Sequence, residues 1–442
     1  MKNKFIITML LISISFYTME PVKADTKDDR EGDYFKERIT NSHKESVLIP
    51  FNEVAKLNVS QAKAVKEEVW KLWKDVNLQM EALPPLSASS EAEMPLHQWE
   101  LIDEDPMPFY FFKKEDSSSK EKKPLFINLH GSGPKEIEFR NTLLLSKKYA
   151  DSPSVYFIPQ IPNVKRYRWW FQPVQDAWEK LFRLAMLHDE IDPNKIFIMG
   201  ISEGAYGSQR LGAYYADYLA GVGPMAGGEP LKNAPPLNYR NTAFSFHTGE
   251  NDTFFGRNAM TALAATTFDS LATKYPGEFI HNIVIQKGRG HAVDYTLTTP
   301  WLKTHTRKTS PDHISWVYFP MHGRYRKGFY NVAITESTEL KEEDEFNRIF
   351  FDIQYKKLDN TIEINSSLMN DEMTATKEVI AGQISLFLDE RYVNFDKKVK
   401  VIYNGKLVHN SKLTLNRRYL VESCALFGDP NRLFPAKISI SL

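Results

Sequence analysis

The sequence predicts an α/β fold with a doubly wound, mostly parallel sheet, followed by a C-terminal all-β domain of sandwich-like type. Between residues 124 and 286, short apolar runs alternate with segments of helical periodicity. Such alternation is typical of parallel strands whose two faces are both covered by helices. After Pro311 the helical periodicity ends and only β-like segments follow, which predicts a separate β domain over residues 311–442.

Residues 1–24 are predicted to form a secretory signal peptide. Lys2 and Lys4 precede an apolar run over residues 5–16, and a short polar stretch leads to Ala24, where cleavage is expected. The apolar run is shorter than the roughly 20 residues that a membrane span requires. We therefore expect an exported protein, periplasmic or extracellular, with no membrane span after the signal is removed.

Length and composition exclude several classes of protein. The chain has 442 residues, more than one hydrophobic core usually serves, so two domains are expected. It carries 56 basic and 56 acidic residues, and this balance gives no electrostatic surface for nucleic acid. Cys424 is the only cysteine, so an internal disulfide is impossible.

Residues 25–94 are predicted to lead into the first domain. The stretch 25–42 is highly charged, a composition that favours a mobile segment. From Ser60 to Leu83, apolar residues recur at spacings of three and four, which predicts an amphipathic helix that the two following prolines end. Residues 86–93 are predicted to be a loop.

The α/β domain is predicted to span residues 95–305. Strands are expected in the apolar runs 125–129, 155–158, 195–199, 221–225, 242–247 and 279–286, and helices at 174–187, 203–219 and 258–274. In the β domain, Asn404-Gly405 lies between two apolar runs and predicts a tight hairpin turn.

Residues 200–204, Gly-Ile-Ser-Glu-Gly, lie directly between a predicted strand and a predicted helix. In that context Gly-x-Ser-x-Gly forms a tight turn with a strained serine, and its glycines let strand and helix approach closely. The start of the helix favours negative charge developing beside the exposed hydroxyl. The pattern alone also fits an ordinary helix-capping serine between turn glycines. The context predicts Ser202 as a nucleophile.

A nucleophilic serine needs a base to take its proton, and the base needs an acid that fixes its tautomer. Asp252 and His291 each follow a late predicted strand, in the chain order serine, acid, histidine. Because the loops after parallel strands open on one edge of the sheet, we expect both residues near Ser202. Glu250 stays a competitor for the acid, and Asp294 a weaker one.

Acyl transfer also needs N–H donors for the oxyanion. One donor is expected from Glu203, the residue after the nucleophile. The other is expected from the loop His130-Gly131-Ser132-Gly133, which follows an early strand, and we assign it to Ser132. A plain glycine turn is the other interpretation of this loop.

Residues 166–171, Arg-Tyr-Arg-Trp-Trp-Phe, precede the helix that leads to the nucleophile strand. Arg168, Trp169 and Trp170 are candidates for stacking on a sugar or an aromatic acid and for holding a carboxylate. The favoured alternative is that the tryptophans pack this helix onto the sheet, since tryptophans are usually buried. Arg257 is a further candidate for substrate binding. The alternative is that its side chain extends into solvent.

Taken together, the segments 129–133, 200–204, 249–252 and 288–291 resemble the α/β-hydrolase superfamily. Within it, the chain resembles secreted bacterial esterases and prolyl-oligopeptidase-like catalytic domains, over roughly residues 120–295. The resemblance implies a Ser-His-Asp hydrolase with no metal and no organic cofactor. Ala205 stands where many relatives have a second glycine, which leaves the subfamily open. No propeller-like repeat precedes the catalytic region, so a full prolyl-oligopeptidase architecture is excluded.

The sequence thus predicts a carboxylic-ester hydrolase that works through an acyl-enzyme on a small-molecule or glycan ester; deacylation of glycans is an expectation by analogy. A prolyl-oligopeptidase-like peptidase would use the same residues and is the nearer alternative. A glycan-binding protein on a hydrolase scaffold is the alternative from another class, and the complete set of catalytic positions argues against it.

Overall fold

The computed structural model describes residues 27–115, 121–163, 165 and 168–442. The predicted signal peptide therefore lies outside the described residues. Among the helices that the structure does describe, none is both long and apolar enough to cross a bilayer.

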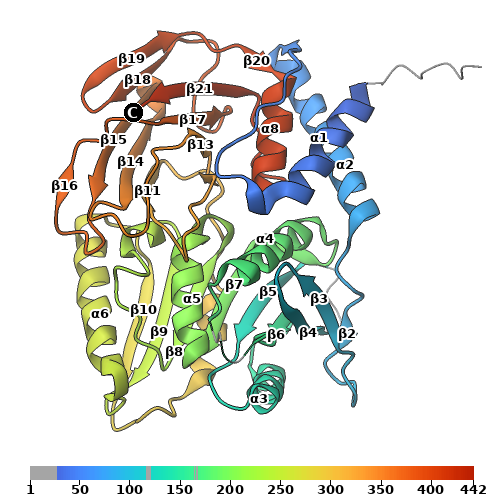
Figure 1. Ribbon diagram of the computed structural model, residues 1–442, viewed down its shortest axis with the longest axis vertical. Coiled ribbons are helices and arrows are strands. Elements are labelled where there is room, and N and C mark those ends of the chain that lie inside the picture. The colour runs from blue at the N-terminus through green and yellow to red at the C-terminus, as the bar shows by residue number, and fades with distance from the viewer. Residues whose placement is uncertain (1–26, 116–120, 164, 166–167) are drawn as a thin grey trace, which may run out of the picture.

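A nine-stranded sheet forms the centre of the described chain (Figure 1). Its strands follow the order β10-β9-β8-β7-β5-β6-β4-β2, and β3 pairs with β4 outside this path. Strands β5 to β10 pair with one another in parallel, whereas β4 is antiparallel to both β3 and β6. The bounds are β2 Ser87–Ala88, β3 His97–Leu101, β4 Glu104–Lys114, β5 Lys123–Leu129, β6 Ser154–Pro159, β7 Ile191–Ile201, β8 Gly221–Met225, β9 Ala243–Gly249 and β10 His281–Gln286.

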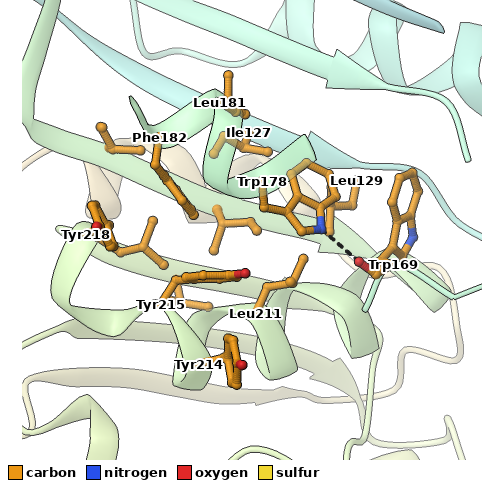
Figure 2. Packing of buried hydrophobic residues seen from close by; sticks show 14 of the residues in the cluster. Ile127, Leu129, Trp169, Trp178, Leu181, Phe182, Leu211, Tyr214, Tyr215 and Tyr218 are labelled. Carbon is orange, nitrogen blue, oxygen red and sulfur yellow. Dashed lines mark hydrogen bonds between the residues drawn. The ribbon is translucent and has the colours of Figure 1, made fainter. Parts of the chain in front are cut away.

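Helices cover both faces of this sheet, as the alternating runs predict. They are α3 Lys135–Lys148, α4 Gln172–Leu187, α5 Glu203–Tyr214, α6 Arg257–Lys274 and α7 Thr298–Leu302. Because side chains alternate along a strand, Ile127 and Leu129 of β5 pack toward α4 and α5 (Figure 2), while Phe126 packs with residues of α3 and α7 on the other face. The doubly wound, mostly parallel sheet predicted from the sequence is confirmed.

The ends of the parallel strands line up on one edge of the sheet. Ile201 of β7 pairs with Met225 of β8, and Met225 pairs with His247 of β9. Thr248 of β9 in turn pairs with Ile285 of β10. Neighbouring strands lie about 4.8 Å apart, so the loops that follow β7, β9 and β10 leave the sheet side by side.

The C-terminal region, residues 313–441, contains two sheets that share an apolar core. One sheet has the order β11-β14-β15-β18-β19 with β16 beside β15, and the other the order β12-β13-β17-β21. The strands are β11 His313–Tyr318, β12 Gly328–Phe329, β13 Val332–Glu336, β14 Arg348–Lys356, β15 Thr361–Met369, β16 Thr376–Lys377, β17 Gln383–Leu388, β18 Val399–Tyr403, β19 Lys406–Ser411 and β21 Ala436–Ser441. The predicted turn at Asn404-Gly405 joins β18 to β19, and both residues have positive φ.

The prediction that this region is all β is wrong, because it contains helix α8, Arg417–Phe427. The helix begins at Asn416, whose side chain accepts a hydrogen bond from the N–H of Arg418, and it ends at Gly428 in the left-handed conformation. Both are ordinary helix-ending signals. Strand β20, Leu415–Asn416, precedes the helix and pairs with β1, Lys56–Leu57.

The N-terminal residues are more ordered than their charge predicts. Residues 27–41 form helix α1, Lys27–Asn41, where a mobile segment was expected, and Phe35 of this helix is fully buried against Trp73. The predicted amphipathic helix is present as α2, Val59–Met80. Both helices pack against α8 (Figure 1). The expected loop 86–93 contains the short strand β2.

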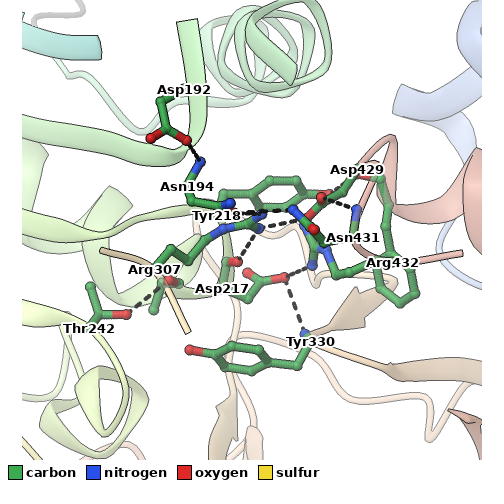
Figure 3. Close-up of polar contacts among 12 residues, drawn as sticks. Asp192, Asn194, Asp217, Tyr218, Thr242, Arg307, Tyr330, Asp429, Asn431 and Arg432 are labelled. Carbon is green, nitrogen blue, oxygen red and sulfur yellow. Dashed lines mark hydrogen bonds and ion pairs between the residues drawn. The ribbon is translucent and has the colours of Figure 1, made fainter. Parts of the chain in front are cut away.

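A buried ion cluster joins the C-terminal region to the central sheet (Figure 3). Asp217, just before β8, pairs with Arg326 and Arg432, and Arg432 also pairs with Asp429. Arg307 pairs with Asp429 and donates to Asn194 near the start of β7. The cluster thus lies at the amino ends of the strands, opposite the edge from which the loops after β7, β9 and β10 leave.

Candidate active site

Ser202 occupies a strained turn between β7 and α5. Its backbone has φ 55° and ψ −115°, a conformation that residues other than glycine rarely adopt and that is found mainly at functional sites. A Cβ on Gly200 would overlap the backbone of Gly204, and a Cβ on Gly204 would overlap the carbonyl of Leu129. Only glycine therefore fits at the two flanking positions. The Ser202 side chain makes no capping hydrogen bond to α5, so the helix-cap interpretation does not describe it.

Asp252 and His291 meet in the loops after β9 and β10. Nδ1 of His291 lies 2.8 Å from Oδ2 of Asp252, and the aspartate is buried while 45% of the His291 side chain is exposed. A carboxylate at Nδ1 holds the proton on that nitrogen and leaves Nε2 as an acceptor. This is the tautomer that a general base for a serine hydroxyl requires.

The two competing carboxylates are bound elsewhere. Oε2 of Glu250 accepts a hydrogen bond from the N–H of Gly288, 2.8 Å away, and so ties the two loops together. Oδ1 of Asp294 accepts from the hydroxyl and the N–H of Thr296, and these bonds lower the pKa of Asp294. Of the three candidate acids, the structure brings Asp252 to His291.

Arg257 reaches the site at the acid. Its Nη1 lies 3.2 Å from Oδ1 of Asp252, and the side chain is buried. Asp252 thus accepts from Arg257 on one oxygen and from His291 on the other. Of the two surroundings expected for Arg257, the structure shows the site and not solvent: the guanidinium holds Asp252 in place. Its contact with substrate stays a prediction.

The loop 130–133 lies against the nucleophile. A Cβ on Gly131 would lie 3.4 Å from the Cβ of Ser202, and Ser132, the next residue, is exposed. The N–H of Glu203 is in the first turn of α5, where backbone N–H groups have no partner within the helix. Both predicted oxyanion donors, Ser132 and Glu203, therefore belong to segments that flank Ser202.

His130 is a site residue whose role the sequence did not predict. It is fully buried, and its Nε2 accepts a hydrogen bond from the N–H of Ile161 while its Nδ1 bonds the carbonyl of Gly131. This pattern requires a neutral ring with the proton on Nδ1. Burial lowers the pKa of His130 to about 4. The imidazole thus fixes the backbone of the loop that carries Ser132.

We expect the neutral state of His130 to make folding sensitive to acid. Because its pKa is about 4 in the folded chain and about 6.5 when unfolded, its contribution to stability is complete above pH ~6.5 and is lost as the pH falls toward ~4. The loss amounts to about 3 kcal/mol. Urea unfolding across this range should show that His130→Asn takes up about one proton fewer on unfolding than the parent. His409→Asn, in the exposed hairpin strand β19, is the control; equal proton uptake in all three proteins would contradict the assignment.

The aromatic candidates for substrate binding are used in packing. Trp169 is fully buried against Gly207 of α5, and its carbonyl accepts a hydrogen bond from Trp178 (Figure 2). Trp170 is 7% exposed and lies under the guanidinium of Arg210, 3.9 Å from the ring centre. The favoured interpretation, in which these tryptophans pack in the core, agrees with the structure. Stacking on a ligand does not, because their faces are already covered.

Arg168 differs from the two tryptophans that follow it. About half of its side chain is exposed, and Nη1 lies 3.3 Å from Oε1 of Glu203. Glu203 follows Ser202 directly, and burial raises the pKa of its carboxyl group. Arg168 therefore lies at the site and stays a candidate for contact with substrate.

Metal ligands do not gather in the part of the chain that the structure describes. No group of three or more His, Cys, Asp or Glu side chains there could hold a metal ion. The single cysteine, Cys424, is buried in α8.

No family model and no curated protein matches the sequence. Solved structures similar in fold include a thermostable esterase, with 16% identity and a TM-score of 0.37 over 48% of this chain and 63% of that one. A ferulic acid esterase matches with 14% identity and a TM-score of 0.34, over 48% of this chain and 98% of that one. Est1E from Butyrivibrio proteoclasticus matches with 14% identity and a TM-score of 0.35, over 47% and 96%.

These similarities concern the fold and cover about half of the chain. The strand order of the central sheet, the helices on its two faces and the strained turn at Ser202 are features of the chain itself. They agree with the resemblance predicted from the motifs. The central region of this chain thus has the doubly wound, mostly parallel sheet and the serine turn that the motifs predict.

Proposed function

We propose that the protein is a serine hydrolase that cleaves carboxylic esters through an acyl-enzyme. The observation that carries this proposal is the 2.8 Å contact between His291 and the buried Asp252, on the same edge of the sheet as the strained Ser202. A buried acid, a half-exposed base in the right tautomer and a nucleophile on a tight turn together make up the machinery of acyl transfer.

In the first half of the reaction, Oγ of Ser202 attacks the ester carbonyl while Nε2 of His291 takes the hydroxyl proton. Asp252 stabilises the imidazolium, and the N–H groups of Ser132 and Glu203 bind the oxyanion of the tetrahedral intermediate. His291 then gives its proton to the leaving alcohol. In the second half, water attacks the acyl-enzyme by the same route, and the carboxylic acid and free Ser202 are released.

The hydroxyl of Ser202 has no hydrogen-bond partner among the described residues. In uncomplexed enzymes the link from nucleophile to base is often long and tightens when substrate binds. The N-terminal pattern of residues 1–24 supports the further proposal that the enzyme acts outside the cytoplasm. Esters of extracellular molecules, glycans among them, are the substrates that we propose on that ground.

The first test is covalent labelling by a fluorophosphonate, measured as intact mass. Such a reagent reacts with a serine hydroxyl only where a base activates it. We expect one adduct on the parent protein and none on Ser202→Ala. His291→Ala should slow labelling by at least about 10³-fold, since the proton then has no acceptor. Ser270→Ala, at an exposed serine of α6 outside the site, is the control that should label like the parent.

Once the labelled residue is known, the protein is assayed for turnover of a panel of esters and peptide amides. Turnover of esters with little or no turnover of amides supports the proposal. Turnover of amides at comparable rates would instead make the protein a peptidase that uses the same residues. A folded parent that acquires no adduct would overturn the assignment of Ser202 as an activated nucleophile.

A further inference from the structure

Two phenylalanines extend into solvent directly after the proposed acid. Phe254 and Phe255 lie on a single helical turn between β9 and α6, and 67% and 71% of their surfaces are exposed. Their ring centres are 4.0 Å apart. Burying a phenylalanine is strongly favourable, so two adjacent rings left in water indicate that something other than the fold requires them.

The turn that carries these rings is held at both ends. The N–H of Asn258 donates to the carbonyl of Asp252 across 3.1 Å, and the N–H of Gly256 donates to the carbonyl of Thr253 across 2.9 Å. The side chain of Asn258 also donates to the carbonyl of Glu250. The two rings are therefore presented by a closed, hydrogen-bonded loop.

Phe255 is strained in this loop. Its φ is +57°, a left-handed conformation that is a genuine outlier for a bulky side chain. Glycine or asparagine would adopt it at lower cost. Because the ring contributes little to the core, neither packing nor backbone preference accounts for phenylalanine here. Strain of this kind concentrates at binding and catalytic sites.

Arg257 connects the aromatic pair to the reacting groups. Its guanidinium carbon lies 5.7 Å from the ring centre of Phe254 and 5.3 Å from that of Phe255. The same guanidinium is bonded to Asp252 and lies 5.9 Å from the ring centre of Tyr206. Tyr206 is on the first turn of α5, where its N–H donates to the carbonyl of Ser202. The aromatic pair is therefore continuous with the catalytic residues through a single side chain.

We propose that Phe254 and Phe255 form a preformed apolar subsite that binds an apolar group of the ester beside the reacting carbonyl. This inference rests on the proposed ester hydrolysis and adds the class of substrate: an ester with an aryl or alkyl group large enough to cover both rings. That group belongs either to the acyl part or to the alcohol part, and the same contact with the rings serves both.

The rigidity of the loop explains how the subsite would act. A loop that is already closed loses little conformational freedom when a ligand covers it, so most of the favourable burial is retained as binding free energy. The apolar group then holds the carbonyl near Ser202 before the chemical step. Its loss should raise KM more than it lowers kcat, because the contact is equally strong in the ground state and the transition state.

The test compares four proteins: the parent, Phe254→Ala, Phe255→Asn and the combination of the two. Leu358→Ala is the matched control, since Leu358 is also an exposed apolar residue but lies in the C-terminal region. Two pairs of substrates separate the two parts of the ester. Para-nitrophenyl acetate and para-nitrophenyl octanoate vary the acyl group, and methyl acetate and benzyl acetate vary the alcohol.

In the double variant, we expect kcat/KM to fall by about 10- to 100-fold, mainly through KM. If the rings bind the acyl part, only para-nitrophenyl octanoate should be affected; if they bind the alcohol part, benzyl acetate and both para-nitrophenyl esters should be affected. Methyl acetate should change by no more than about twofold in either case. The esters that respond identify the part of the ester that the rings bind. Phe255→Asn should lose selectivity while its midpoint of thermal unfolding stays the same or rises, because asparagine tolerates the left-handed backbone.

The inference is overturned if the double variant changes both members of each pair equally, or if Leu358→Ala has the same effect. It is also overturned if the variants change the oligomeric state with no change in selectivity, since the rings would then bind a second copy of the chain. A parent that hydrolyses no ester refutes the proposed function itself. A parent that hydrolyses small and large esters without preference refutes only the subsite.

Discussion

Replacing Asp252 with asparagine is expected to lower kcat for ester hydrolysis by about 10⁴-fold without unfolding the chain. The reason lies in the two partners of the carboxylate. Arg257 donates to Oδ1 and His291 lies against Oδ2. Since a guanidinium only donates, it would draw the amide oxygen of the new side chain toward itself and turn the NH₂ group toward Nδ1 of His291. The imidazole would then carry its proton on Nε2 and could not accept one from Ser202.

Glu250→Gln is the matched control for this variant. Glu250 is two residues from Asp252, but its side chain accepts from the N–H of Gly288, and the amide oxygen of glutamine can accept the same bond. We expect kcat to change by less than about threefold, as for an exposed neutral hydrogen bond. Steady-state kinetics on one ester measures both variants. A large loss in Glu250→Gln with a small one in Asp252→Asn would reverse the assignment of the acid.

A second variant tests the role given to Arg257. In the double variant Asp252→Asn, Arg257→Met, no guanidinium fixes the amide, so the asparagine can turn its oxygen toward Nδ1 and restore the working tautomer. We expect the double variant to recover about tenfold in kcat over Asp252→Asn alone. A merely structural role for Arg257 predicts the opposite, a double variant that is less active than either single one.

The α/β sheet was predictable because its parallel strands are continuous apolar runs. Strand β5 is buried along its whole length and β7 from residue 196 to residue 200, so both contain apolar runs without a period. Strand β4 escaped prediction because Pro106 and Pro108 interrupt it, and proline is otherwise a signal against a strand. It lies near the edge of the sheet, where β3 and β6 pair with it. Proline is tolerated near the edge of a sheet, whereas in the centre of a sheet it is not.

The first helix shows how tertiary contacts override composition. Helix α1 is rich in charge, which predicts a mobile segment, but Glu31 forms a buried ion pair with Arg417 of α8 and Phe35 fills a gap beside Trp73. Neither contact is visible in the sequence, because the partners are 386 and 38 residues away. Helix α8 carries Arg417, and its packing against α1 and α2 is equally absent from the sequence.

The candidate site was predictable in its nucleophile, acid and base because chain order and strand ends determine where such loops lie. The residues that support the site were harder to predict from the sequence. His130 was assigned only to a glycine-rich loop, although a histidine before Gly-Ser-Gly was a signal for a fixed loop. The sequence offered Trp169 and Trp170 as candidates for stacking, with packing favoured, but gave no sign that Phe254 and Phe255 are exposed. Exposure depends on packing between distant segments, and the sequence alone does not contain it.

Replacing Asp217 with asparagine is expected to destabilise the folded chain by about 3–5 kcal/mol, the usual cost of an uncompensated buried charge. Asp217 is fully buried and accepts from Arg326, from Arg432 at 2.5 Å and from the N–H of Tyr330 at 3.2 Å (Figure 3). The neutral amide would leave Arg326 without a carboxylate partner and Arg432 with Asp429 alone. Urea unfolding at neutral pH measures the loss, and catalysis by the folded fraction should be unchanged, since the cluster is at the far edge of the sheet from Ser202.

The variant should also change the response to acid. Burial alone would raise the pKa of Asp217, but Arg326 and Arg432 outweigh it and hold the pKa below its ordinary value. A lowered pKa contributes stability that is complete above the unfolded pKa of about 3.9 and is lost as the pH falls through the folded value. Asp217→Asn should therefore lose less stability below pH ~4 than the parent does, while the His130 window between pH ~4 and ~6.5 stays the same.

Asp189→Asn is the control for Asp217→Asn, because Asp189 is also paired, with Lys74 at 2.9 Å, but 86% of its side chain is exposed. An exposed pair contributes less than about 1 kcal/mol. A second variant, Asp217→Asn with Arg432→Met, removes one of the stranded charges and should be more stable than the sum of the two single losses predicts. If instead the losses simply add, the positive charges left by the loss of the Asp217 carboxylate do not destabilise the folded chain. The junction between the sheet and the C-terminal region would then depend on apolar packing rather than on this ion cluster.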